Sequence, residues 1–429
     1  MKKDYSVIPI LQEKSNFFCG GKWQELYLYL NHGLSNSCHH PLPHEIPEEL
    51  LSDPYTLHNT PHKLKMQQLM MAGHRPNECH MCWQIEDADP EAVSDRMVKS
   101  QIYADSISTL HPDPHHVPRF IEVVFDNYCN LTCSYCDSGQ SSSWATRITQ
   151  QPLPLETDHR HLYSKVHIQP GSTKPAHLDA WLRWWPEIKH RVDKLKVSGG
   201  EPLMSPNFWQ FAEYSASPTT NFSINSNFAT KTQLIQKFID YTSGFKSVLV
   251  SASVDAVGPI AEYARQGLDY ELFLRNIEYY FNNSDSRFKF NLQSTVNIFS
   301  VWGFIDKLNL SLELKRRYPD RMYTMYTTVV KFPEFQSVLL LPEATTQRMA
   351  AEIEQWLAQH ETELELNEYS FISKIATYLK HRPAHVSQID QHKLKFDFKQ
   401  FLLYYNSYSQ HNYADIYPAE FVDWVDSIK

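Results

Sequence analysis

The sequence predicts an α/β protein whose core is a parallel sheet, and two observations support this fold class. Between residues 118 and 335, six short runs of apolar or alternating residues recur, and segments of helical pattern separate them. Alternating strands and helices are the sequence pattern of parallel strands joined by crossover helices. The residues with the clearest chemical character follow the ends of these runs, where barrel enzymes carry their active sites. We therefore expect a site at the carboxyl edge of the sheet.

The predicted elements follow one another in regular order. The strands are expected at 120–125, 195–198, 222–227, 247–255, 288–296 and 323–330. Helical patterns lie at 181–190, 208–215, 232–241, 270–281 and 301–314, and after the last strand at 342–360, 365–380 and 393–428. The fifth strand is the clearest, because its apolar residues alternate with a period of two.

Three cysteines follow the first predicted strand in the spacing Cys-x3-Cys-x2-Cys, at Cys129, Cys133 and Cys136. Thiolates are soft ligands that select iron–sulfur clusters and zinc. Three of them on one tight loop can hold three irons of a 4Fe–4S cluster and leave the fourth iron open to a small-molecule chelate. Zinc normally requires a fourth cysteine or histidine close by, and residues 137–140 offer neither. An open cluster is therefore favoured over a zinc knuckle or buried thiols.

This spacing, with the aromatic Tyr135 directly before the third cysteine, resembles the radical S-adenosylmethionine (SAM) enzymes. The resemblance implies a partial (β/α)6 barrel, similar to a TIM barrel, with the cluster loop after its first strand. It also implies that the amino and carboxylate groups of SAM chelate the unique iron. An electron from the reduced cluster would cleave the sulfonium and release a 5′-deoxyadenosyl radical, which abstracts a hydrogen atom from the substrate.

A Gly-Gly-Glu motif ends the second predicted strand, at Gly199, Gly200 and Glu201. Glycines let the backbone approach a ligand closely, and a glutamate accepts hydrogen bonds from an ammonium group. On its own, such a motif is more often a simple turn. Its place at a strand end after the cysteine loop matches the radical SAM motif that is assigned to the amino group of SAM.

Three further SAM contacts are implied by the same resemblance. Asn227 ends the third predicted strand in a sequence close to the family's Thr-Asn-Gly, although Phe228 stands where the family has glycine. Ser253 matches the Ser-x-Asp signature of the fourth strand, whose serine lies near the SAM carboxylate and ribose in relatives. Arg265 matches an arginine that contacts the SAM carboxylate, but an isolated arginine is otherwise usually a solvated surface charge.

The other four of the seven cysteines precede the barrel, at Cys19, Cys38, Cys79 and Cys82. The pattern Cys-x13-Gly-x4-Cys around Gly33 resembles the first half of a SPASM or twitch domain, which holds an auxiliary 4Fe–4S cluster. In relatives that domain usually follows the barrel, so this module should pack beside the barrel mouth if it has the same role. A structural zinc site with four ligands is the alternative, and His39, His40, His74 and His80 are near enough in sequence to replace a cysteine.

These assignments divide the chain into four parts. Residues 1–104 form the auxiliary module, 105–118 a proline-containing linker, 119–335 the barrel and 336–429 a helical region that could cover its open side. A long polar insertion at 148–176 separates the cluster loop from the next helix. Because long loops in compact domains are often lids, we expect it to cover the active site.

Composition limits the partners and the location. The formal net charge is −9 and the longest basic run is Lys315-Arg316-Arg317, so no nucleic acid is expected, since its binders carry basic patches. No apolar run reaches the length of a membrane span, and no long apolar stretch follows the first charged residues as in a signal peptide. A cytoplasmic protein without membrane contact is expected, in keeping with thiols that must remain reduced.

The sequence thus predicts a radical SAM enzyme with two clusters that takes electrons from an external donor such as flavodoxin or ferredoxin. Its substrate would be a small molecule, such as a sugar or an aminocyclitol, or a peptide. A two-electron oxidation assisted by the auxiliary cluster is one outcome, and epimerisation and bond formation are others. The alternatives are a non-catalytic metal-binding scaffold with a degenerate barrel and a structural zinc site, and an activase that installs a glycyl radical on a partner.

Overall fold

The fold is organised around one nine-stranded sheet, in the order β11-β10-β8-β7-β6-β4-β1-β2-β3. The computed structural model describes residues 11, 13–89, 91–153, 155, 174–381 and 391–429. The strands are β1 (Glu25–Tyr29), β2 (Leu34–Asn36), β3 (His44–Glu45), β4 (Phe120–Val124), β6 (Lys194–Ser198), β7 (Asn221–Ser226), β8 (Ser247–Ser253), β10 (Phe288–Val296) and β11 (Tyr326–Val329). A separate two-stranded ribbon pairs β5 (Thr132–Cys133) with β9 (Arg265–Gln266).

All six predicted strands are present, and each pairs in parallel with its neighbour from β4 to β11. The prediction of an α/β fold with a parallel sheet is therefore confirmed. The sheet ends at β11 on one side and continues past β4 on the other, where β1 pairs in parallel with it. β1, which belongs to the predicted auxiliary module (the N-terminal module), thus extends the same sheet. No sequence pattern had indicated that β1 pairs with β4.

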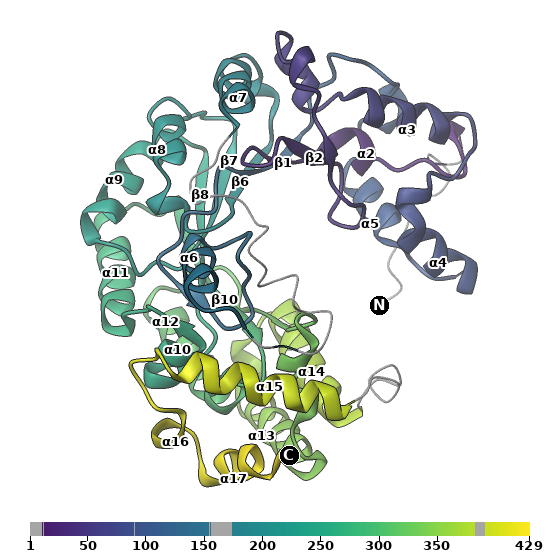
Figure 1. The fold of residues 1–429 in the computed structure, drawn as a ribbon. Helices are drawn as coiled ribbons and strands as arrows, with labels where there is room; N and C mark the ends of the chain where they lie inside the picture. Colours follow the sequence, from purple (N-terminus) through teal and green to yellow (C-terminus); the bar gives the residue numbers. More distant parts are fainter. Residues whose placement is uncertain (1–10, 12, 90, 154, 156–173, 382–390) are drawn as a thin grey trace.

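Helices cover the sheet and form the two ends of the molecule (Figure 1). They are α2 (Gly21–Gln24), α3 (Pro61–Met71), α4 (His80–Ala88), α5 (Asp95–Ile102), α6 (Ser142–Gln150), α7 (Pro175–Ile188), α8 (Pro206–Ala212), α9 (Thr232–Thr242), α10 (Gly258–Ala264), α11 (Tyr270–Asn283), α12 (Phe304–Arg317), α13 (Glu343–His360), α14 (Leu366–His381), α15 (Gln391–Asn406), α16 (Tyr413–Ile416) and α17 (Ala419–Ser427).

Polar N-caps fix where several of these helices begin. The side chain of Ser205 accepts a hydrogen bond from the amide of Phe208 at 3.0 Å, and Asp269 accepts one from Leu272 at 2.8 Å. Ser141 accepts from Trp144 at 3.2 Å. Each cap satisfies an amide that has no partner inside its helix, so α8, α11 and α6 start just after the loops that carry polar site residues.

The helical pattern predicted over 393–428 corresponds to three separate helices in the structure. α15 ends at Asn406, and α16 and α17 are separated at Tyr417 and Pro418. A proline disfavours helical geometry in the residue before it, which explains the second break. Serines at 407 and 409 compete for backbone hydrogen bonds, and the Ser407 hydroxyl donates to the carbonyl of Tyr404 at 2.7 Å.

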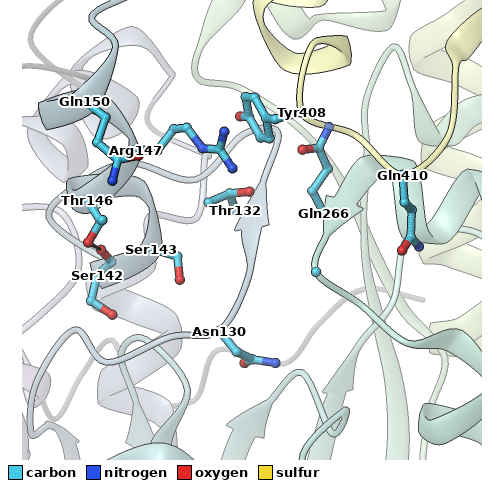
Figure 2. A pocket seen from close by; sticks show the side chains of 11 residues that line it. Asn130, Thr132, Ser142, Ser143, Thr146, Arg147, Gln150, Gln266, Tyr408 and Gln410 are labelled. Carbon is cyan, nitrogen blue, oxygen red and sulfur yellow. Dashed lines mark hydrogen bonds between the residues drawn. The ribbon is translucent and has the colours of Figure 1, made fainter.

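The C-terminal helices reach back to the cysteine loop. The hydroxyl of Tyr405 in α15 donates to the carbonyl of Thr132 at 2.7 Å, and the side chain of Gln336 donates to the carbonyl of Ser134. Tyr408, directly after α15, lies under the guanidinium of Arg147 in α6, 3.4 Å from its ring centre (Figure 2). This region therefore supports the loop that carries Cys129, Cys133 and Cys136.

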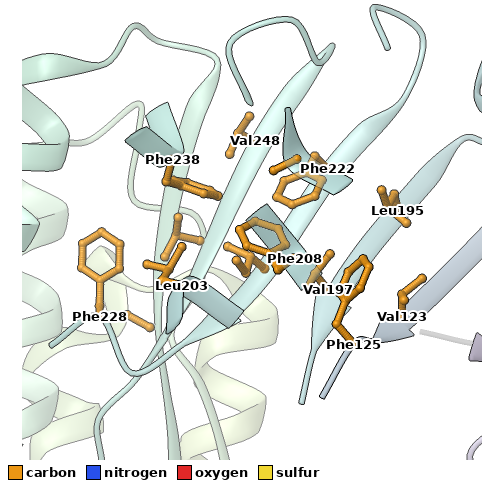
Figure 3. Packing of buried hydrophobic residues seen from close by; sticks show 14 of the residues in the cluster. Val123, Phe125, Leu195, Val197, Leu203, Phe208, Phe222, Phe228, Phe238 and Val248 are labelled. Carbon is orange, nitrogen blue, oxygen red and sulfur yellow. The ribbon is translucent and has the colours of Figure 1, made fainter. Parts of the chain in front are cut away.

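The main core lies between the parallel sheet and the helices that cover it. Val197, Phe222 and Val248 point from β6, β7 and β8 toward Phe208 and Phe238 of the covering helices (Figure 3). Central parallel strands are buried on both faces, so they are rich in apolar residues. Because burial of each large apolar side chain is worth roughly 1.5–3 kcal/mol, this packing fixes the strands whose ends form the site.

The predicted linker also contributes to packing. Residues 105–118 contain a 3-10 turn at Ile107–Thr109 and bury Ile107, Leu110 and Val117. The indole of Trp23 donates to the carbonyl of His111 at 2.9 Å. This segment thus ties the N-terminal module to β4. Most of the insertion at 148–176 lies outside the described residues, so its role as a lid remains a prediction.

Candidate active site

The three cysteines of the loop after β4 line one cavity, which we call the cluster cavity. Its volume is about 220 Å³. The other lining residues come from the chain between β4 and α6, from the carboxyl ends of β6, β7, β8 and β10, and from β9: Leu131, Tyr135, Gln140, Ser198, Gly199, Gly200, Asn225, Ser226, Asn227, Ser253, Arg265, Gln293 and Thr295. The cavity lies where parallel α/β folds bind their ligands, and it brings together every SAM contact predicted from the sequence except Glu201.

The residues of the cluster cavity fit a metal group held by three thiolates. Burial, and then the nearby Cys133, raise the pKa of Cys129 to about 12, and burial also raises the pKa values of Cys133 and Cys136. Buried thiols of this kind become anions when they bind a metal. Among the described lining residues there is no fourth cysteine and no histidine. The donor set is that of a 4Fe–4S cluster with one open iron, and not that of closed tetrahedral zinc.

Gly199 and Gly200 are required by close contact with the chain that leads into the cysteine loop. Gly199 has a φ of +122°, and a Cβ there would lie 2.9 Å from the carbonyl oxygen of Asp126. A Cβ on Gly200 would lie 2.7 Å from the backbone carbon of Asn127. The amide of Glu201 donates to the carbonyl of Tyr128 at 2.5 Å. The Gly-Gly turn thus holds the start of the cysteine loop against the end of β6.

Glu201 is not among the residues that line the cavity, and the interaction of its carboxylate with the SAM amine stays a prediction. The side chain is 1% exposed and accepts from the amide of Asn227 at 2.5 Å, the hydroxyl of Ser226 at 2.8 Å and the amide of Leu203 at 3.0 Å. Burial raises its pKa to about 7. Both oxygens accept hydrogen bonds, so Glu201 braces the end of β7 against the turn after β6.

Asn227 lies at the cavity but also spans two loops. Its amide nitrogen donates to the side chain of Asn130 at 2.8 Å, and its oxygen accepts from the amide of Ala229 at 3.0 Å. Phe228 has a φ of +55°, the left-handed conformation that a glycine would adopt without strain. Its ring is buried against Tyr280 and Phe290. The chain therefore keeps the turn of the Thr-Asn-Gly motif without its glycine, and packing of the ring compensates the strain.

Arg265 is buried and paired, so it is not a solvated surface charge. Its Nε donates to Asp255 at 2.8 Å, a second nitrogen donates to the same carboxylate at 3.2 Å, and a third lies 3.5 Å from the sulfur of Cys133. The hydroxyl of Tyr135 accepts from Arg265 and donates to Asp255 at 3.0 Å. The arginine lines the cavity, its hydrogen bonds go mainly to Asp255, and its contact with the SAM carboxylate stays a prediction.

Asp255 is the main site residue that had no role in the sequence-based prediction. It is fully buried, and besides its two side-chain partners it accepts from the amide of Thr295 at 2.8 Å. Asp255 therefore joins the ends of β8 and β10 to Tyr135, the residue directly before Cys136. Its position in the Ser-x-Asp signature was the available signal. Gln293 and Thr295 also line the cavity, and their place at the carboxyl end of a predicted strand could have identified them.

The four N-terminal cysteines also face one cavity, the N-terminal cysteine cavity, together with Lys22, Arg96 and Lys99. Burial raises the pKa values of all four thiols, to about 12 for Cys79. Cys38, His39 and Asp95 offer ligand atoms within 4.8 Å of one another. Four thiolates can hold an iron–sulfur cluster or zinc.

The two cysteine sites lie at opposite edges of the sheet, not side by side at its carboxyl edge as expected. Glu25, which binds Lys99 at 2.5 Å, pairs with Phe120 at the amino end of β4. Cys38 follows β2, which runs antiparallel to β1. Cys129 follows the carboxyl end of β4, and the five residues of that strand alone span about 16 Å. Sequence could not reveal this arrangement, because it depends on the pairing of β1 with β4.

Comparisons with known proteins identify few relatives. No protein-family model and no curated protein sequence matches the chain. Among solved structures, it is similar to Streptococcus suis SuiB bound to S-adenosylmethionine, at 13% identity and a TM-score of 0.36 over 79% of this chain and 69% of that one. SuiB bound to the precursor peptide SuiA gives 13% identity and a TM-score of 0.37 over 79% and 70%. At these values the likeness carries no weight, and the functional assignment depends on the residues of this chain.

Proposed function

We propose that the protein is a radical SAM enzyme that cleaves SAM reductively and abstracts hydrogen from a substrate. The observation that carries this proposal is the convergence of Cys129, Cys133 and Cys136 on one cavity at the carboxyl edge of a parallel sheet. A site with three thiolates leaves one iron of a 4Fe–4S cluster open. The Gly199-Gly200 turn, Asn227 and Ser253 surround the same cavity, as the family resemblance requires.

Residues of this chain would hold each group in place. The three cysteines would bind the cluster, and Gly199, Gly200, Asn227 and Ser253 would contact SAM. When bound, the cluster and SAM together supply a 5′-deoxyadenosyl radical for hydrogen abstraction. Arg265, held by Asp255 and Tyr135, would direct one N–H group at Cys133 and would position the cluster loop. Glu201 would hold the amide of Asn227 in place.

The lining of the cluster cavity supports a substrate rich in hydroxyl or amide groups. Arg265 is the only charged side chain among the described lining residues other than the cysteines, and Asp255 neutralises it. Serine, threonine, asparagine and glutamine offer both donors and acceptors. A sugar, the hydroxyl groups of a cyclitol or a peptide backbone would be complementary to this surface, whereas a cationic amine would find no carboxylate in it.

The N-terminal cysteines would hold a second 4Fe–4S cluster, or alternatively zinc. Their place at the other edge of the sheet argues against direct contact with a substrate in the cluster cavity. A second cluster there would relay electrons or stabilise the module, so a two-electron oxidation would need a path through the protein. Iron and zinc analysis distinguishes the two metals: two cubane clusters give about eight irons per chain, and a zinc site gives about four irons and one zinc.

The proposal is tested by anaerobic reconstitution with iron and sulfide, reduction with dithionite and addition of SAM. We expect 5′-deoxyadenosine from the wild-type protein and none from Cys133→Ala. If a fully reconstituted protein binds iron but produces no 5′-deoxyadenosine, the non-catalytic scaffold is the correct description. We expect an external one-electron donor, such as flavodoxin or ferredoxin, to replace dithionite in the cell.

A further inference from the structure

A second cavity lies on the outer side of the cysteine loop, and we call it the outer groove. Its volume is about 540 Å³. The side chains of Ser142, Thr146 and Gln150 line it from α6, and Gln266 and Gln410 line it from the other side (Figure 2). Every described lining residue is polar or glycine, and Arg147 is the only charged one. The groove is thus a polar hollow with one positive charge, that of Arg147, unlike a pocket for an apolar ligand.

The cluster cavity and the outer groove share one thin wall. Successive residues of an extended chain point to opposite faces. Leu131 and Cys133 line the cluster cavity, whereas Asn130 and Thr132 between them line the outer groove. In the paired strand β9, Arg265 faces the cluster cavity and Gln266 the groove. A single layer of backbone therefore separates the two spaces.

Side chains that line the groove bind the backbone of the cysteines directly. The hydroxyl groups of Ser142 and Ser143 donate to the carbonyl of Cys129 at 3.3 Å and 2.7 Å. The indole of Trp144, which is buried and does not line the groove, donates to the carbonyl of Cys133 at 2.9 Å. A molecule in the groove would therefore touch groups that are one or two bonds away from the residues proposed to hold the cluster.

The proposed reaction has two requirements, substrate contact and electron supply, and this wall allows each to be met from a different side. Hydrogen abstraction demands direct contact between the substrate and the radical, so the substrate must enter the cluster cavity. An electron can instead pass through a layer of bonded and hydrogen-bonded backbone. The outer groove therefore has access to the cluster for electrons but not for substrate atoms. Transient redox partners need only a small contact surface, because their interfaces bury less than about 1,200 Å².

We propose that the outer groove is the docking site for a one-electron carrier protein that reduces the cluster. This inference depends on the proposed function. In each event, a reduced flavin or iron–sulfur carrier loses one electron, and the oxidised 4Fe–4S cluster gains it; no bond forms or breaks. The carrier places its exposed prosthetic group over Asn130 and Thr132, against the polar face of α6.

The test fills the groove without touching the cysteines. Thr146 and Thr149 are both exposed on α6, and each hydroxyl donates to the carbonyl four residues earlier, at 2.9 Å and 2.8 Å. Only Thr146 lines the groove. Thr146→Trp should therefore block docking, and Thr149→Trp is the matched control. Reduced flavodoxin and reduced ferredoxin serve as separate probes, and bleaching of the cluster absorbance reports its reduction rate.

With at least one carrier, we expect Thr146→Trp to slow cluster reduction about ten-fold, equivalent to roughly 1.4 kcal/mol of lost association. Thr149→Trp should match the wild type, and dithionite should bleach all three proteins equally. Thr146→Trp should also weaken binding of the oxidised carrier to the cluster-free protein, whereas Thr149→Trp should leave this binding unchanged. Equal rates for Thr146→Trp and the wild type, equal slowing with dithionite, or no reduction of the wild type by either carrier would overturn the docking site. A reconstituted wild type that dithionite bleaches but that forms no 5′-deoxyadenosine contradicts the proposed function instead.

Discussion

The buried ion pair between Arg265 and Asp255 gives the most quantitative prediction of the structure. Arg265 is 7% exposed and Asp255 is fully buried. Replacing Arg265 with leucine leaves the Asp255 carboxylate inside the protein with only the hydroxyl of Tyr135 and the amide of Thr295 as donors. Removing one partner of a buried ion pair typically destabilises a protein by about 3–5 kcal/mol. We expect Arg265→Leu to lower the free energy of unfolding of the metal-free protein by that amount.

Urea unfolding followed by tryptophan fluorescence measures this loss. The double variant Arg265→Leu with Asp255→Asn should recover part of it, because it removes the unpaired charge as well. Arg316→Leu, which breaks an exposed ion pair with Glu363, is the control and should leave the unfolding midpoint unchanged. A loss below about 1 kcal/mol for Arg265→Leu, as is usual for surface pairs, would refute the view that this pair holds the ends of β8 and β10 to the cysteine loop.

Three further predictions follow from the site. Because burial raises the pKa of Glu201 to about 7 from an ordinary value of 4.5, the folded state keeps a proton that the unfolded chain releases. The stability that Glu201 contributes should therefore fall as pH rises from 4.5 to 7, by up to about 1.4 kcal/mol per pH unit relative to Glu201→Gln, and parallel pH profiles of the two proteins would contradict this. Gly200→Ala should reduce iron binding at Cys129, Cys133 and Cys136, because its Cβ meets the backbone of Asn127; Gly73→Ala, at a glycine with open space around it, should retain full iron. Cys82→Ser should remove the metal of the N-terminal site and leave about four irons in the cluster cavity, so loss of all iron in this variant would show that the two sites are not independent.

The sequence predicted those features that depend on local pattern. Strands of period two and apolar runs gave all six parallel strands, and the spacing of Cys129, Cys133 and Cys136 predicted three thiols that the structure brings to one cavity. Residues at the ends of parallel strands must lie near one another, so Asn227 and Ser253 could be placed without coordinates.

Other features depend on tertiary packing, and the sequence did not reveal them. The Glu201 carboxylate accepts three hydrogen bonds that tie β7 to the turn after β6, and no spacing in the sequence indicates these bonds. The pairing of β1 with β4 moves the N-terminal cysteines to the far edge of the sheet. Arg265 differs from a surface arginine only through Asp255, whose distance depends on the fold.

Electron paramagnetic resonance of the reduced protein, with and without SAM, tests the central claim most directly. An open iron in the cluster cavity should bind the amino and carboxylate groups of SAM, so addition of SAM should change the g-values of the signal from the cluster on Cys129, Cys133 and Cys136. Cys82→Ser, without the N-terminal metal, should show the same change. A cluster signal that SAM leaves unaltered would contradict the account, because its iron would then have no open position.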